Sequence, residues 1–322
     1  MIENLPKVEL HLHLDGSIRL ETACELLNMN YYDVKKNMVA SSKCEDLNDY
    51  LTKFNYPEKI LQTKENLERV AYELAVDLKK DNVIYAEVRF APLKHINEGL
   101  SLDDVVLSIL RGLRRVDVKV NLILCMMRND SFNDNLKVIE LALKYLNKGV
   151  VGIDLAGAEA LYKTSSFKNL FDIALKNNIP FTIHAGEADG YDSILAAINF
   201  KTKRIGHGIN SIHYDDLIEL IKEKNILLEV CPTSNVQTNV VDRYYNHPIK
   251  KLFDKGVKLC INTDNRTVSN VTLNDEYNKL YKYFNFDIDS FIKMNLFAIE
   301  HAFISDLEKN DLKEEYLKLI NR

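Results

Sequence analysis

The feature that most constrains the fold is a short, β-branched apolar run that recurs along the chain and is followed each time by a longer amphipathic stretch. Each run has the length of a strand and ends in turn residues. The eight runs are Val8–Leu14, Val83–Pro92, Val120–Met127, Val150–Gly157, Pro180–Glu187, Arg204–Gly208, Ile226–Pro232 and Val257–Asp264. Strands that alternate with helices predict a parallel α/β sheet, and eight of them are the number that closes a (β/α)8 TIM barrel. An open, doubly wound sheet is the alternative.

The stretches between the runs carry helical signals. Residues 67–82 place apolar side chains at three- and four-residue steps, and Ser101 is a predicted N-cap followed by acidic residues. The connection between the first two runs, residues 15–82, is long, and we expect extra helices there, including one in residues 47–54. No Gly/Ser/Pro linker interrupts the pattern, so residues 1–322 are predicted to form a single barrel domain.

Charge and cysteine content exclude several classes of protein. The 322 residues are 46% apolar and carry a net charge of −5, whereas nucleic-acid-binding proteins are more often basic. The five cysteines form no C-x-x-C pair, which argues against a disulfide framework and favours a reducing compartment. We see neither a signal peptide nor an apolar run of about 20 residues. We therefore expect a cytoplasmic protein that binds neither nucleic acid nor a membrane.

Two of the eight histidines, His11 and His13, lie one residue apart at the end of the first run. Side chains alternate along a strand, so both rings point to the same face. Taken alone, the pair is equally well explained by two polar residues that are satisfied by local hydrogen bonds.

Three further runs end in side chains that bind metals or transfer protons. His184 and Glu187 end the fifth run, His207 ends the sixth and Asp264 ends the eighth. Barrel active sites lie at the carboxyl ends of the strands, and unrelated core histidines would not all fall there. Imidazole and carboxylate together suit zinc or another borderline divalent metal. The sequence therefore predicts a metal-dependent active site at this end of the barrel.

Other polar residues receive structural interpretations. Glu87 and Arg89 are predicted to form a buried ion pair with each other, and Cys231 is interpreted as a strand end and not as a ligand. Four histidines are predicted to be ordinary surface or capping residues: His95, His213, His247 and His301. The motif of the cytidine-type zinc deaminases is absent from the sequence.

Together these motifs resemble those of the adenosine deaminases of the amidohydrolase superfamily. The matching stretches occur in that family's order: VELHLHLDGS, GIDLAGAE, TIHAGE, RIGHG, VCPTSN and NTDN. They extend from Val8 to beyond Asp264. Any one stretch is weak evidence, but the ordered set is highly specific.

The resemblance implies one catalytic Zn²⁺ per chain. Its protein ligands would be His11, His13, His184 and Asp264. This is one protein ligand more than the three that are common in catalytic zinc sites, and a water would take a fifth position. Glu187 matches the family's proton donor, and His207 matches the histidine that positions or deprotonates the attacking water.

The resemblance also implies a purine site beside the metal. The backbone N–H of Gly157 matches the contact to purine N3, and Asp15 matches the carboxylate at the ribose. His13 is expected to contact the substrate as well as the metal. Residues 47–54 resemble the family's apolar gate helix. The expected pocket lining from this helix is Leu47, Tyr50, Leu51 and Phe54.

One position departs from the best-known family pattern. Many members carry two consecutive aspartates where this chain has Asp264 and Asn265. The second side chain faces purine N7, which only accepts hydrogen bonds. An amide donates there directly, whereas a carboxylate must first hold a proton. Asn265 therefore stays an expected substrate contact.

The implied reaction is hydrolytic deamination of adenosine, and of 2′-deoxyadenosine, to inosine and ammonia in purine salvage. Glu187 would protonate N1 while a zinc-activated water attacks C6. Adenine and 5′-methylthioadenosine stay open as alternative substrates. AMP is disfavoured because no cluster of Arg or Lys lies near the motifs.

The expected partner is a small-molecule purine nucleoside. Two other classes of function are possible alternatives to its deamination. A non-catalytic purine-binding homologue would be free to lose ligands or the acid, yet all of them are present. A two-metal hydrolase of amides or phosphoesters often uses a lysine at a strand end, and none ends the run Val150–Gly157. The oligomeric state is left open.

Overall fold

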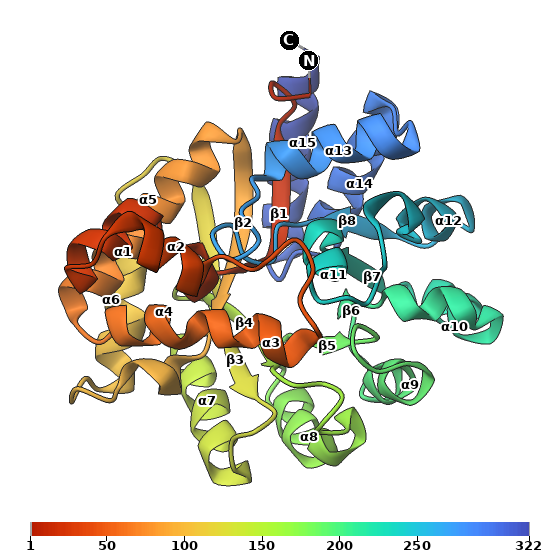
Figure 1. Ribbon diagram of the computed structural model, residues 1–322. Helices are drawn as coiled ribbons and strands as arrows, with labels where there is room; N and C mark the ends of the chain where they lie inside the picture. The colour runs from red at the N-terminus through yellow and green to blue at the C-terminus, as the bar shows by residue number, and fades with distance from the viewer. Residues whose placement is uncertain (1, 322) are drawn as a thin grey trace.

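The computed structural model describes residues 2–321, in which eight parallel strands are surrounded by helices (Figure 1). The strands are β1 (Lys7–His13), β2 (Val83–Phe90), β3 (Lys119–Met127), β4 (Val150–Ala156), β5 (Thr182–Ala185), β6 (Arg204–His207), β7 (Leu227–Val230) and β8 (Leu259–Ile261). β1 to β4 pair in sequence order, and so do β5 to β8. Parallel bridges from Leu12 to Asp264 and from Ile153 to Phe181 join the two sets. The fold is the predicted (β/α)8 barrel.

The helices lie around the strands. They are α1 (Leu20–Leu27), α2 (Tyr31–Met38), α3 (Leu47–Leu51), α4 (Asn55–Ile60), α5 (Lys64–Lys80), α6 (Leu102–Leu113), α7 (Phe132–Tyr145), α8 (Lys168–Lys176), α9 (Tyr191–Asn199), α10 (Asp215–Glu223), α11 (Pro232–Gln237), α12 (Ile249–Asp254), α13 (Leu273–Phe284), α14 (Ile288–His301) and α15 (Asp306–Ile320). Ser101 caps α6 through a capping box with Asp104, as predicted. Within residues 2–321, none of these helices combines the length and apolar character that a membrane crossing requires.

The long connection after β1 contains extra helices, as predicted. It holds α1 to α5, and residues 47–54 form α3 and a 3₁₀ turn. A small apolar cluster of Ala40, Cys44, Tyr50 and Val268 packs this segment against the loop that follows β8. The backbone N–H of Ala40 also donates to the carbonyl of Val268 (2.8 Å). The inserted segment is therefore tied to the carboxyl end of the barrel.

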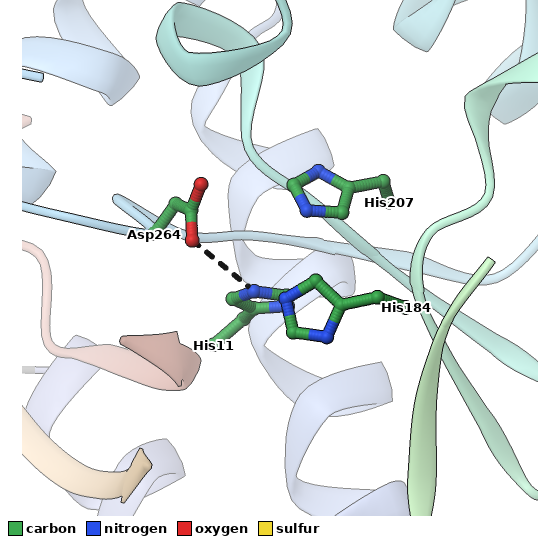
Figure 2. Close-up of side chains that lie close together, drawn as sticks. All are labelled: His11, His184, His207 and Asp264. Carbon is green, nitrogen blue, oxygen red and sulfur yellow. Dashed lines mark ion pairs between the residues drawn. The ribbon is translucent and has the colours of Figure 1, made fainter. Parts of the chain in front are cut away.

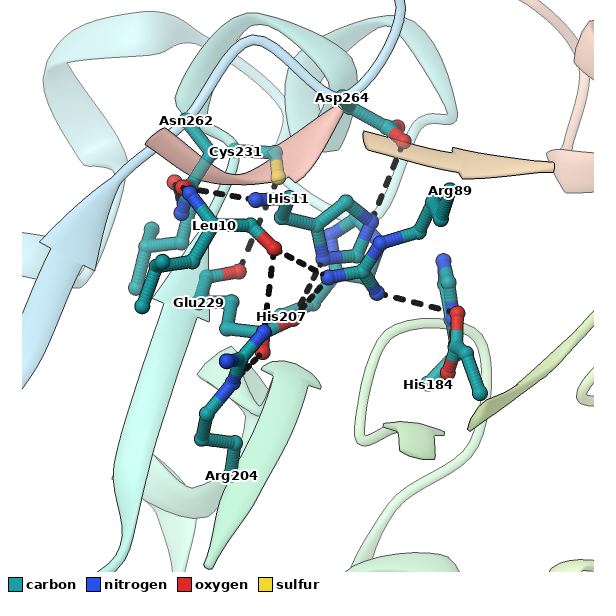
Figure 3. Close-up of polar contacts among 12 residues, drawn as sticks. Leu10, His11, Arg89, His184, Arg204, His207, Glu229, Cys231, Asn262 and Asp264 are labelled. Atoms are coloured by element: carbon teal, nitrogen blue, oxygen red, sulfur yellow. Dashed lines mark hydrogen bonds and ion pairs between the residues drawn. The ribbon is translucent and has the colours of Figure 1, made fainter. Parts of the chain in front are cut away.

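Charged side chains fill part of the barrel interior (Figure 3). Arg204 is completely buried and bonds both Glu87 and Glu229, with 2.5 Å between its Nε and Oε1 of Glu229. Arg89 is equally buried and bonds Glu229 (2.8 Å) and Asp154 (3.0 Å). The predicted pairing of Glu87 with Arg89 is therefore wrong. Both residues are buried, but each long arginine side chain crosses the barrel interior and meets carboxylates from other strands.

The prediction that the remaining histidines are surface or capping residues is wrong for His95. His95 is buried, whereas His213 is exposed as predicted. His247 and His301 are buried as well, but each contacts the end of a helix: His247 Nδ1 accepts from the N–H of Ile249, the first residue of α12, and His301 Nδ1 lies 2.8 Å from the carbonyl of Phe297 in the last turn of α14. Burial lowers the pKa of both His95 and His247 to about 3. These rings are neutral at pH 7, which is why they can lie inside the protein without a counter-ion.

Removing one member of a buried ion network leaves its partners charged and uncompensated, which costs about 3–5 kcal/mol. We therefore expect Arg204→Met to lower the free energy of unfolding by that amount, measured by urea denaturation. The matched control is Arg111→Met, because the pair of Arg111 with Glu68 is solvent-exposed. The control should lose about 1 kcal/mol or less. Equal losses in the two variants would contradict a structural role for the interior network.

Candidate active site

A cavity of about 360 Å³ opens at the carboxyl ends of the strands, a size typical of small-ligand sites. Its polar wall contains seven of the predicted site residues: His13, Asp15, His184, Glu187, His207, Asp264 and Asn265. All four predicted gate residues line it as well, and so does Gly157. The cavity is thus largely apolar on the side of the inserted helices, where Glu58 is the charged exception, and ionisable on the side of the strand ends.

Four side chains converge on one point (Figure 2): His11, His184, His207 and Asp264. Their ligand atoms all lie within 4.8 Å of one another. His13 is close by, since its Nε2 lies 3.4 Å from Nε2 of His184 and 3.4 Å from Oδ1 of Asp264. The structure thus brings together every residue predicted to bind metal and adds His207 to the cluster.

Carboxylates fix two of these rings from behind. His11 Nδ1 lies 2.9 Å from Glu229 Oε2, and His184 Nδ1 lies 2.9 Å from Asp154 Oδ2. Burial opposes ionisation of Asp154, but His184 and Arg89 hold its pKa below the usual value. Each ring then donates from Nδ1 and keeps the lone pair of Nε2, which is the usual arrangement of histidines that bind metals. Asp154 and Glu229 were missed from the sequence, where each is a single acid inside an apolar strand.

The donor set fits a divalent metal. Nε2 of His11 is buried and has no hydrogen-bond partner among residues 2–321, and such a buried nitrogen is costly unless something binds it. Asp264 offers a carboxylate oxygen 3.3 Å from this nitrogen. Imidazole lone pairs and a carboxylate at one point are the ligands that zinc and similar ions prefer.

His207 and Asp264 are held in a conformation that non-glycine residues rarely adopt. Their φ angles are 60° and 61°, in the left-handed region. Backbone strain of this kind persists only where the surrounding structure enforces it. For Asp264, backbone bonds to His11 and His13 do so, and Ser234 Oγ donates to Oδ2 at 2.6 Å. The strain aims both side chains into the cluster.

Glu187 is a buried carboxyl group at the edge of the cluster. Burial, reinforced by the nearby charge of Asp264, raises its pKa to about 8. Its Oε2 lies 3.5 Å from His207 Nε2. A carboxyl group with such a pKa holds its proton at neutral pH and can act as a general acid.

Glu159, the last residue of the GIDLAGAE stretch and one with no predicted role, holds the loop that carries Glu187. Its buried carboxylate accepts hydrogen bonds from one hydroxyl and four backbone N–H groups: Ser193, Gly186, Glu187, Ala188 and Asp189, at 2.5–3.1 Å. The only sequence signal for this role was the position of Glu159 at the end of GIDLAGAE. Its partners became visible only once β4 and β5 lay side by side.

The remaining predicted contacts lie around the cavity. Asp15 is buried there, and burial raises its pKa to about 7. Gly157 has a φ of 101°, a conformation that favours glycine. Asn265 Nδ2 donates to the hydroxyl of Tyr50 at 3.1 Å, which links this amide to the gate segment.

Comparison with known proteins gives consistent matches over nearly the whole chain. A family model described as adenosine deaminase matches residues 6–319. An adenosine deaminase of Clostridium perfringens is 42% identical, covering 96% of this chain and 97% of its own. Among solved structures, an Arabidopsis N6-mAMP deaminase has a TM-score of 0.88 at 28% identity, with coverage of 98% and 99%. Arabidopsis ADAL complexed with IMP has a TM-score of 0.89 at 27% identity, with coverage of 98% and 97%.

The contacts of Glu159 make a testable prediction. In Glu159→Gln one acceptor oxygen becomes an NH2 group that faces N–H donors, and hydrogen bonds to a charged acceptor contribute about 1.5–3 kcal/mol each. Amide hydrogen exchange of residues 186–189 should therefore accelerate by about tenfold or more, measured by mass spectrometry. Glu140→Gln, on the exposed face of α7, is the matched control. Unchanged exchange in Glu159→Gln would show that the loop holds its shape without this carboxylate.

Proposed function

The chain belongs to the adenosine deaminase family, and from this premise we propose that it hydrolyses adenosine to inosine and ammonia. The observation that carries the proposal is the convergence of a metal-type cluster and a neutral, buried acid on one cavity. 2′-Deoxyadenosine is a further expected substrate, because none of the proposed contacts requires the 2′-hydroxyl group.

The proposed cofactor is one Zn²⁺ per chain. His11, His13, His184 and Asp264 would hold it, with His11 and His184 oriented by their carboxylate partners. Zinc bound there would lower the pKa of a coordinated water to about 7 and so provide the nucleophile at neutral pH.

The chain's own residues would perform the remaining steps. Glu187 donates its proton to N1 of the purine, so that C6 becomes electrophilic and accepts the oxygen of water. His207 and Asp264 orient that water toward C6. One proton of the water then passes to the amino group, the C6–N bond breaks and ammonia leaves. The other proton of the water passes to the carboxylate of Glu187, so the product carries a carbonyl at C6 and the acid is restored.

The purine itself would be read by groups around the cavity. The backbone N–H of Gly157 would donate to N3, and the amide of Asn265 to N7. Asp15, with His13 beside it, would contact the ribose. The gate residues would cover the apolar face of the ring and exclude bulk water.

We propose a nucleoside in preference to a nucleotide, although one structural neighbour is named an N6-mAMP deaminase and another is complexed with IMP. Lys94 is the one lysine or arginine side chain on the cavity wall within residues 2–321, and Glu58 lines the same cavity. A 5′-phosphate would be attracted by Lys94 and repelled by Glu58. The net attraction expected of a dedicated phosphate site is therefore missing.

The test is a parallel assay of ammonia release by the zinc-loaded protein from adenosine, adenine, 5′-methylthioadenosine and AMP. Fast release from adenosine supports the proposal. Release mainly from adenine would keep the chemistry and change the substrate, and release mainly from AMP would point to the nucleotide. No release from any of the four would support a non-catalytic role.

Glu187→Gln should retain metal and lose turnover. A general acid contributes about 10²–10⁴ in rate, and glutamine fills the same space without a transferable proton. We expect kcat to fall within that range, with zinc content unchanged in elemental analysis. Full activity in this variant would remove Glu187 from its proposed role.

His11→Ala is the matched contrast to this variant. It should lose zinc as well as turnover, because it deletes a proposed ligand together with the ring that Glu229 orients. Unchanged zinc content would show that His11 does not bind the metal.

A further inference from the structure

A chain of hydrogen bonds leads from the loop after β7 to His207. The backbone N–H of Ile249 donates to Nδ1 of His247 at 3.1 Å. His247 Nε2 lies 3.2 Å from Oδ1 of Asn235, and Nδ2 of Asn235 lies 3.0 Å from Nδ1 of His207. Each of these side chains is buried. The path therefore runs through protein from a main-chain donor to the active-site ring.

The main-chain donor fixes the direction of every bond in this path. A backbone N–H can only donate, and burial lowers the pKa of His247 to about 3, so this neutral ring carries its hydrogen on Nε2. His247 Nε2 then donates to Asn235 Oδ1, which leaves Asn235 Nδ2 to donate to His207. Because His207 Nδ1 accepts, the hydrogen of a neutral His207 lies on Nε2.

This tautomer distinguishes His207 from its neighbours in the cluster. His11 and His184 donate from Nδ1 to carboxylates, so their Nε2 lone pairs are free to bind a metal. The Nδ1 of His207 instead accepts from the amide of Asn235, so this ring carries a single hydrogen, on Nε2. It presents an N–H, and not a lone pair, to the point where all the rings meet.

The same amide nitrogen also reaches the acid. Asn235 Nδ2 lies 3.4 Å from Oε1 of Glu187, so the amide that contacts His207 also contacts the carboxyl group of the acid.

We propose that Asn235, held in place by His247, is the positioning residue that puts hydrogen on Nε2 of His207. The inference rests on the deamination proposed above and deepens it. His207 orients the attacking water as a hydrogen-bond donor and is neither its base nor a metal ligand. Asp264 is then the carboxylate of the cluster that can accept the proton of the water.

The direct test is ¹⁵N NMR of the zinc-loaded protein with labelled histidine, because protonated and unprotonated ring nitrogens differ widely in chemical shift. The signals of His207 are identified by their loss in His207→Gln. We expect hydrogen on Nε2 of His207 and on Nδ1 of His11 and His184. Hydrogen on Nδ1 of His207 in the wild-type protein would overturn the proposal, whatever the variants do.

Asn235→Asp is the decisive variant, because it replaces the donor by an acceptor of nearly the same shape. One carboxylate oxygen still accepts from His247, while the other should draw the hydrogen of His207 to Nδ1. We expect the tautomer to invert and kcat to fall by about 10²–10⁴-fold. An unchanged tautomer in this variant would overturn the proposal.

Variants of His247 test the first part of the path. His247→Phe removes the donor to Asn235 and should give a mixture of His207 tautomers, whereas His247→Gln keeps an N–H and should restore the wild-type signals. His301→Phe, a buried histidine near the amino ends of the strands, is the matched control. If His247→Phe affects the tautomer no more than this control does, His247 has no positioning role. Absent ammonia release with the expected tautomer would instead contradict the proposed function alone.

Discussion

The site depends on two arginines that are buried inside the barrel. Arg89 contacts both Asp154 and Glu229, and Arg204 contacts Glu229 from the other side (Figure 3). Carboxylates in so dry an interior would be neutral without these charges. Because Glu229 and Asp154 stay ionised, they hold the rings of His11 and His184 so that the Nε2 lone pairs point into the cluster. The geometry of the metal cluster is therefore set beneath the cavity, by groups that no substrate touches.

The barrel separates two chemical tasks by the kind of partner behind each ring. The rings of His11 and His184 are backed by carboxylates, whereas His207 is backed by the amide of Asn235. A carboxylate behind His207 would have given it the same tautomer as the others. The acidic proton of the site belongs to Glu187. The carboxylate of Glu159 holds the loop that carries this residue by accepting hydrogen bonds from its backbone. One small cavity can thus hold a cation and an acidic proton next to each other.

Much of this arrangement was predictable because parallel strands end at the same edge. His11, His184, His207 and Asp264 each follow an apolar run, and the barrel brings run ends together without further information. The pairing of Glu87 with Arg89 failed for the opposite reason. Adjacency along one strand says nothing about which carboxylates a long side chain meets across the barrel.

The sequence by itself determined the alternation of strands and helices, the inserted segment after β1 and the residues at the strand ends, since these depend on local pattern and chain order. The tertiary structure alone decided the partners: Glu229 behind His11, Glu159 beneath Glu187, and His247 behind Asn235. His247 lies in a loop twelve residues beyond Asn235, and no periodicity marks it. Hydrogen-bond direction depends on atoms that meet only after folding, so the proton positions of the site are a property of the fold.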